Sequence, residues 1–182
     1  MNDNHKLLTG AWLDAIGTII SAIAEVRALA GLNTINNRLV TVGEGLQAVG
    51  TLLVGTVTTD DPLNFAGNWI DGAGAATSSI AAYLQDVDDE NEIDYTQIEI
   101  LGDALQSMGA SISATADHLM GEQEYALGNS LQGLGAGLEA IGGVYKLNQR
   151  EENGQLLTTI GAIIQALGSN YNALIAARDM MQ

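Results

Sequence analysis

Cysteine is absent from this chain of 182 residues, proline occurs once, and lysine and arginine together number six. Without cysteine there is no disulfide framework, no thiolate nucleophile and no thiolate metal site. The six basic residues stand against 22 acidic ones, so the formal net charge is −16. Because proteins bind phosphate backbones through clustered Lys and Arg, this balance argues against a nucleic-acid partner.

Aromatic residues are also scarce, at 4%, whereas apolar residues make up 47% of the chain and glycine occurs 22 times. The apolar share is too high for a disordered acidic polymer, so the chain can bury a core. Its length fits one domain over residues 1–182. The first apolar stretch is interrupted by Asp14 and lacks a basic leader, unlike a secretory signal. We therefore expect a cytoplasmic protein, with non-classical export left open.

One eight-residue pattern recurs six times: Gly, two residues, Leu or Ile, Asp or Gln, a small residue, an apolar residue, and Gly again. Its copies occupy residues 10–17, 43–50, 67–74, 102–109, 128–135 and 161–168. Long and short spacings between successive copies alternate, which groups the copies in pairs. The sequence therefore predicts a triplicated two-helix unit, with repeats at approximately 6–57, 62–119 and 122–180.

The apolar residues of each copy lie three and six positions after the first Gly and form one stripe on a helix. This period predicts an all-α protein with helices near 6–30, 37–57, 62–86, 95–119, 122–146 and 151–180. The expected architecture is a six-helix bundle or a short solenoid of three hairpins. Asp61 before Pro62 is a typical helix start, and Asp94 resembles another.

Glycine inside a helix costs about 0.5–1 kcal/mol relative to Ala, so repeated glycines need a compensating contact. Close helix–helix packing supplies one, because a Gly has no Cβ. The position five after the first Gly is also small in all six copies. Small residues on two sides indicate that each helix is sandwiched between neighbours, in its own chain or in another subunit.

The fifth residue of each copy is always polar: Asp14, Gln47, Asp71, Gln106, Gln132 and Gln165. These residues either form a ladder that lines a channel or ligand groove, or fix helix register by hydrogen bonding, as polar residues do in coiled coils. The second interpretation is favoured. Trp12 and Trp69 occupy equivalent places and are expected to be packing anchors rather than contacts for a partner.

The opening Gly-Ala-Trp-Leu-Asp-Ala-Ile-Gly at 10–17 and the later Gly-x-x-Leu-Gln-Ala-Val-Gly copies resemble an uncharacterised repetitive helical family of Bacillus-type Firmicutes. The resemblance covers most of the chain. It implies no activity, cofactor or site residue.

No Lys or Arg occurs between Arg38 and Lys146. The favoured interpretation of this segment is an acidic, solubilising surface over an apolar Gly/Ala bundle. A surface that binds a basic protein partner is the alternative. The acidic segment Asp86–Asp94 lacks the spacing of an EF-hand, so no dedicated Ca²⁺ site is expected. Asp117, His118 and Glu122 do not match a di-iron pattern, and the Gly-rich run 133–137 lies mid-helix rather than after a strand.

We find no catalytic, cofactor-binding or metal-binding residues in this sequence and expect a protein that is not an enzyme. The first hypothesis is a structural or interaction protein that self-associates as a homo-oligomer. The second is a conditional membrane-inserting or pore-forming protein, whose helices would have to turn their polar sides toward each other. The third is a carrier of an apolar ligand held between helices.

Overall fold

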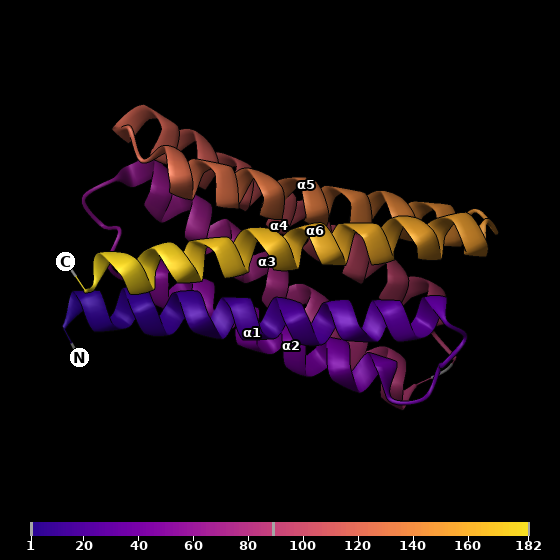
Figure 1. Ribbon diagram of the computed structural model, residues 1–182. Coiled ribbons are helices and arrows are strands. Elements are labelled where there is room, and N and C mark those ends of the chain that lie inside the picture. The colour runs from indigo at the N-terminus through magenta and orange to yellow at the C-terminus, as the bar shows by residue number, and fades with distance from the viewer. Residues whose placement is uncertain (1, 89, 182) are drawn as a thin grey trace.

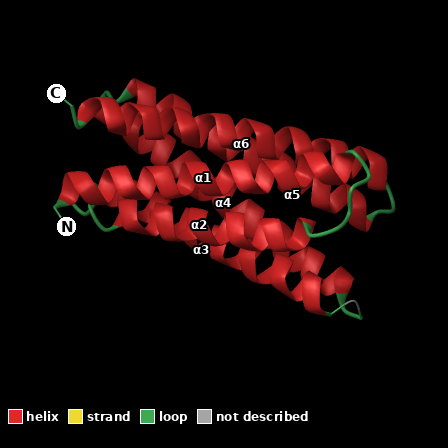
Figure 2. Cartoon of the chain, turned by 60° about the horizontal axis from the view of Figure 1, so that its bottom comes forward, coloured by secondary structure: helices red, strands yellow, loops and turns green. Residues whose placement is uncertain are grey.

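The computed structural model describes residues 2–88 and 90–181, which form six α-helices joined by short loops (Figures 1 and 2). This confirms the all-α prediction. The helices are α1 (Asp3–Leu29), α2 (Asn36–Gly55), α3 (Pro62–Val87), α4 (Glu92–Met120), α5 (Gln123–Leu147) and α6 (Glu151–Asp179).

The six helices form a closed ring in chain order. Each helix packs against the helix before it and the helix after it, and α6 packs against α1. Within the described parts of the chain, the backbones of other helix pairs do not approach one another closely. The arrangement is therefore a six-helix bundle of the barrel type and not an open solenoid. Both ends of the chain lie at the same end of the barrel (Figure 1).

Most helix ends agree with the sequence prediction to within a few residues. Asp61 caps α3 as expected, because its Oδ1 accepts hydrogen bonds from the backbone N–H groups of Leu63 at 3.0 Å and Asn64 at 3.3 Å. The start of α4 is an exception, since this helix begins at Glu92 and not near residue 95. Asp94 therefore lies inside the first turn, where a negative charge is still favourable.

Each hairpin is closed by glycines that face each other across its two antiparallel helices. In α3–α4, a Cβ built on Gly74 would lie 2.6 Å from the carbonyl oxygen of Gly102. A Cβ built on Gly10 would likewise lie 2.6 Å from the carbonyl oxygen of Gly50 in α1–α2. A Cβ built on Gly135 would lie 2.6 Å from the carbonyl oxygen of Gly161 in α5–α6. Real Cβ atoms do not approach a carbonyl oxygen this closely, so only glycine permits these backbone contacts.

Neighbouring hairpins meet through the second row of small residues. Gly72 of α3 faces the side chain of Leu52 on α2. Ser107 of α4 donates a hydrogen bond to the carbonyl oxygen of Gly133 on α5 at 2.8 Å. The seam between α1 and α6 is built from Ala11, Ala15, Ala173 and Ala176. Both rows of small residues are thus used within one chain.

The ring reverses the usual distribution of polar and apolar side chains. Among the described residues, the buried apolar side chains are almost all Ala, with Ile175 as the large exception. The largest fully buried side chains are polar: Gln47, Thr18, Ser78 and Ser169. The other isoleucine, leucine and valine side chains of the described residues, and both tryptophans, are exposed or half-buried instead. The expected acidic surface over an apolar bundle is therefore wrong for the helix bodies, where the acids face inward.

Candidate functional site

The polar interior of the ring is the candidate functional site, and a tier of three glutamines crosses its middle. Gln47, Gln106 and Gln165 occupy equivalent positions on α2, α4 and α6 and are all buried. Gln165 donates from Nε2 to Oε1 of Gln106 at 2.9 Å, and Gln106 donates to Oε2 of Glu44 at 3.0 Å. Gln47 donates to Oε1 of Glu44 at 2.6 Å. This glutamine tier links three helices across the interior.

Each hairpin also brings one carboxylate to the next level. Ser21 of α1 donates to Glu44 of α2 at 2.9 Å, and the equivalent Ser78 of α3 donates to Asp103 of α4 at 2.8 Å. In the third hairpin the acid is on the other helix, because Glu139 of α5 occupies the place of the two serines. Three acids, one per hairpin, therefore lie at this level.

Polar side chains also line the interior near both ends of the barrel. At the end away from the chain termini, Glu25 of α1 accepts hydrogen bonds at 2.8 Å from Gln155 and Thr158 of α6. Lys146 lies 4.0 Å from the same Glu25 oxygen. At the end that holds the termini, Asp117 accepts from Asn64 and Asn129, each at 2.7 Å.

A cavity of about 320 Å³ opens the interior at the end that holds the termini. Its walls include Asp14, Asp71 and Gln132, the equivalent fifth positions of α1, α3 and α5, which we call the aspartate tier. A larger hollow of about 800 Å³ lies between α4 and α5, but it carries no acidic side chain. The chemistry is therefore concentrated inside the ring.

The ionisable groups inside the ring are almost entirely acidic. Eight carboxylates lie on inward-facing or half-buried positions: Asp14, Glu25, Glu44, Asp71, Glu99, Asp103, Asp117 and Glu139. Among the described residues, Lys146 is the one cation within ion-pair distance of any of them. Burial raises the pKa of Asp14 to about 8 and that of Glu44 to about 7, and it raises the pKa values of Asp71, Asp103 and Glu139 well above their ordinary values. These carboxyls are therefore ionised at neutral pH only where water or a counter-cation stabilises the charged form.

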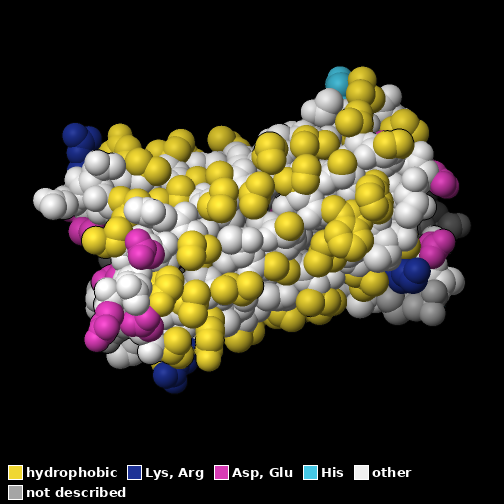
Figure 3. All heavy atoms as spheres, turned by 180° about the vertical axis from the view of Figure 1, so that it is seen from behind, with side chains coloured by type: hydrophobic (Ala, Val, Ile, Leu, Met, Phe, Trp, Pro, Cys, Tyr) yellow, Lys and Arg dark blue, Asp and Glu magenta, His cyan; other side chains and the backbone are white. Residues whose placement is uncertain are grey.

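The outer surface is apolar between the two ends of the barrel, and we call this surface the outer belt. Its members are exposed: Trp12, Ile16, Ile19, Ile23, Val42, Val49, Trp69, Ile80, Leu101, Met108, Leu127, Leu134, Ile141, Ile160, Ile163, Leu167 and Leu174. In the described parts of the chain, every exposed charged side chain lies in a loop, at a chain end, or in the first or last turn of a helix. Figure 3 shows the same separation, with charged groups gathered at the two ends.

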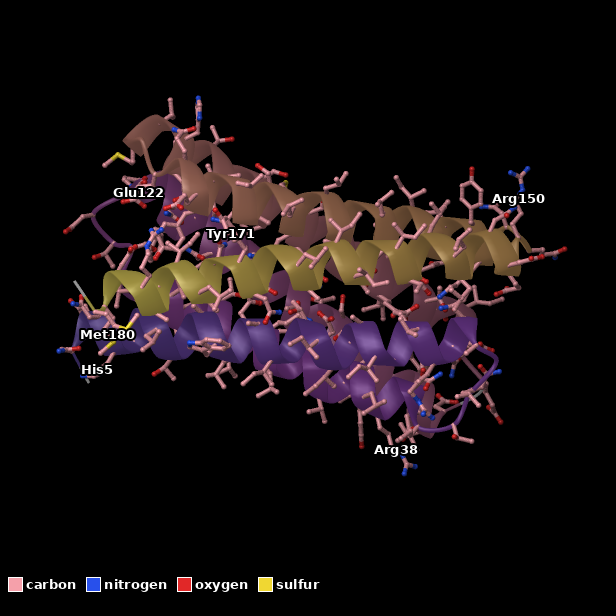
Figure 4. All side chains as sticks on the ribbon, in the orientation of Figure 1. His5, Arg38, Glu122, Arg150, Tyr171 and Met180 are labelled. Atoms are coloured by element: carbon pink, nitrogen blue, oxygen red, sulfur yellow. The ribbon has the colours of Figure 1, made fainter. Side chains whose placement is uncertain are left out.

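Charged residues lie at both ends of the barrel. Arg38 and Arg150 lie at one end, and Glu122, His5 and Met180 lie at the other (Figure 4). At the latter end, Arg178 of α6 pairs with Glu124 of α5 at 2.7 Å. On α1 the exposed large apolar side chains, including Val26 and Leu29 beyond the belt, run from Trp12 to Leu29, about 25 Å at 1.5 Å per residue.

The polar fifth positions are the sequence feature that the structure brings together. All six lie toward the interior, but they differ in their contacts. Gln165 bonds to Gln106, and Gln47 and Gln106 both bond to Glu44, whereas Asp14 and Asp71 form no side-chain hydrogen bond within the described residues. The tryptophans are less buried than expected, with Trp12 37% exposed and Trp69 43% exposed. Trp69 still packs between hairpins, because its indole lies against Gly55.

The other sequence candidates are dispersed. In the acidic segment, Asp86 pairs with Arg38 at 2.9 Å, and residue 89 lies outside the described residues. Asp88 accepts hydrogen bonds from Tyr95, Asn91 and the backbone of Glu90, which hold the pKa of its carboxyl below the ordinary value. Asp117 is buried, whereas His118 is exposed and bonds to Gln123.

Helix α1 is long and apolar enough to cross a membrane by length and composition, and it is the one helix in the described residues that meets both criteria. The other helices have 20 to 29 residues, which corresponds to about 30–44 Å. Their mean hydropathy is lowered by the polar residues that face the interior. A hydropathy average therefore does not reveal which side of each helix is apolar.

The model of a family of unknown function (DUF6944) matches residues 5–173. No curated protein and no solved structure matches the chain. The family match extends from the first residues of α1 into the last turns of α6, so it includes all three hairpins. The chain therefore belongs to the DUF6944 family of unknown function.

Proposed function

We propose that this protein is a membrane-inserted helical barrel, a non-enzymatic pore-forming protein whose interior is a hydrophilic path. The observation that carries the proposal is the reversed distribution of side chains: carboxylates and amides inside, large apolar residues outside. In water this arrangement is unfavourable on both sides, because it exposes apolar surface and buries charge. In a bilayer the same arrangement is favourable, since the outer belt contacts acyl chains.

In this ring the helices turn their polar sides toward each other, as membrane insertion requires. Polar residues such as Thr158, Thr159 and Gln165 made α6 unsuitable as an isolated span. All three are buried against other helices. Asp14, in the middle of α1, faces the cavity. The close glycine contacts are also the packing that membrane helices use, where no hydrophobic effect drives association.

The two other hypotheses receive less support from these features. Self-association was inferred from small residues on two sides of each helix, and both sides are occupied within one chain. A dimer contact would cover one patch, whereas the outer belt extends over all six helices. The carrier hypothesis requires an apolar interior, and this interior is lined by acids and amides.

Flotation with phosphatidylcholine liposomes, combined with release of an entrapped dye, tests the proposal. We expect the protein to float with the vesicles and release the dye, at neutral or mildly acidic pH. The variant I16E/I163E places two carboxylates in the middle of the outer belt. Each should cost about 2.5–3.5 kcal/mol in a membrane, so flotation should be lost.

Leu32→Glu is the matched control, because Leu32 is equally exposed but lies in the loop after α1. This variant should float like the wild type. Protein that remains at the bottom at both pH values, with no dye release, would contradict the proposal. A discrete multimeric mass of that soluble protein would then favour self-association.

A further inference from the structure

Asp14 is a buried carboxyl group without a hydrogen-bond partner among the described residues. It is 9% exposed, lies at the wall of the cavity, and accepts no hydrogen bond from residues 2–88 or 90–181. Glu44, which is also buried, differs in this respect because it accepts from Ser21, Gln47 and Gln106. The Asp14 carboxylate is thus left to interact with whatever occupies the cavity.

The surroundings of Asp14 favour a cation. Asp71 and Gln132 share its tier, and their oxygens together form an oxygen-rich wall without a Lys or Arg in the cavity lining. Carboxylate and amide oxygens are the ligands of hard metal ions. Rings of Asp and Glu select cations in channels because their field attracts positive ions and repels anions.

We propose that the aspartate tier, Asp14, Asp71 and Gln132, is a transient binding site that selects small metal cations over anions entering the barrel. The inference rests on the proposed pore function and specifies what that pore passes. The cavity lining does not include the glutamine tier, so a cation that goes further must open the hydrogen bonds of that tier before it meets the carboxylates Glu44, Asp103 and Glu139. The path is therefore lined by negative or neutral oxygen-bearing groups at each level.

The site is suited to passage rather than to storage. In the described residues no three acidic or histidine side chains lie close enough together to hold a metal ion. Conduction requires binding strong enough to admit the ion and weak enough to release it. A pair of carboxylates with one amide fits this requirement better than a closed cage of ligands.

The reversal potential in planar phosphatidylcholine bilayers under a KCl gradient tests the selectivity. Wild-type protein should reverse close to the K⁺ equilibrium potential. In D14N/D71N the side chains keep their shape but can no longer ionise when a cation approaches, so the reversal potential should shift toward zero. The control E151Q/E152Q removes two exposed acids from the start of α6 and should shift the potential much less.

The outcomes separate this inference from the proposed function. Currents that show no preference for K⁺ over Cl⁻, or an unchanged reversal potential in D14N/D71N, would overturn the cation site and leave the pore intact. Absence of any current would count against the pore. In that case the midpoint of thermal unfolding tests the cation site. KCl should raise this midpoint more than N-methylglucamine chloride does, and only when Asp14 and Asp71 are present. An equal effect of both salts would overturn the site.

Discussion

The interface inside a hairpin differs from the interface between hairpins, although both use small residues. Inside a hairpin, glycines place one helix backbone against the other, as at Gly74 and Gly102. Between hairpins, a small residue on one helix faces a side chain on the next, as Gly72 faces Leu52. Side chains can change rotamer and backbones in helices cannot, so the hairpin is the rigid unit and the barrel adjusts between hairpins.

Gly74→Ala should have the largest effect, because its Cβ would lie 2.6 Å from both the Gly102 carbonyl oxygen and the Gln106 nitrogen. We expect a net loss of about 1–3 kcal/mol in the free energy of unfolding, typical of overpacking. Alanine's better helix propensity recovers only about 0.5–1 kcal/mol of the gross cost. Denaturant unfolding followed by circular dichroism measures the change. A variant as stable as the wild type would show that the hairpin is not rigid.

Gly72→Ala should have a smaller effect, of about 1 kcal/mol or less, since its Cβ meets the Leu52 side chain at 2.6 Å and a backbone oxygen only at 3.4 Å. The same unfolding measurement applies. In a Leu52→Ala background the substitution should become neutral or stabilising. If Gly72→Ala costs as much there as in the wild type, the contact with Leu52 does not account for the loss.

Gly45→Ala should have the smallest effect and the opposite sign. Its Cβ would meet Ser79 Oγ at 3.4 Å, an ordinary van der Waals contact. Because Ala is the better helix former, we expect a gain of about 0.5–1 kcal/mol in the free energy of unfolding. A loss of stability would mean that Gly45 packs more closely than the structure indicates.

The helices and their close packing could be predicted because both depend on local signals. The apolar period gives the helices, and the repeated glycines indicate close contacts. The polar fifth positions, such as Asp14 and Gln106, were also recognised as one set. Their spacing marks them as one set, but it did not identify them as site residues, and it does not include Glu44, Asp103 or Glu139.

The direction in which these residues face could not be predicted. An amphipathic stripe shows that a helix has two sides, but not which side meets the solvent. The interpretation of an acidic outer surface assumed water on the outside, whereas acids of the stretch between Arg38 and Lys146, such as Glu44, are buried. One signal in the sequence points the other way: the six cations are all near helix ends, so no helix body presents a basic residue to water.

The closure of α6 on α1 has a consequence for the origin of the fold. Each hairpin offers one edge to the next, so three identical copies of a single hairpin could close the same ring. An ancestral homotrimer of this kind would have been restricted to threefold-symmetric linings. In a single chain that restriction does not apply, and the interior is not threefold symmetric: the acid is on the second helix in two hairpins and on the first helix, as Glu139, in the last.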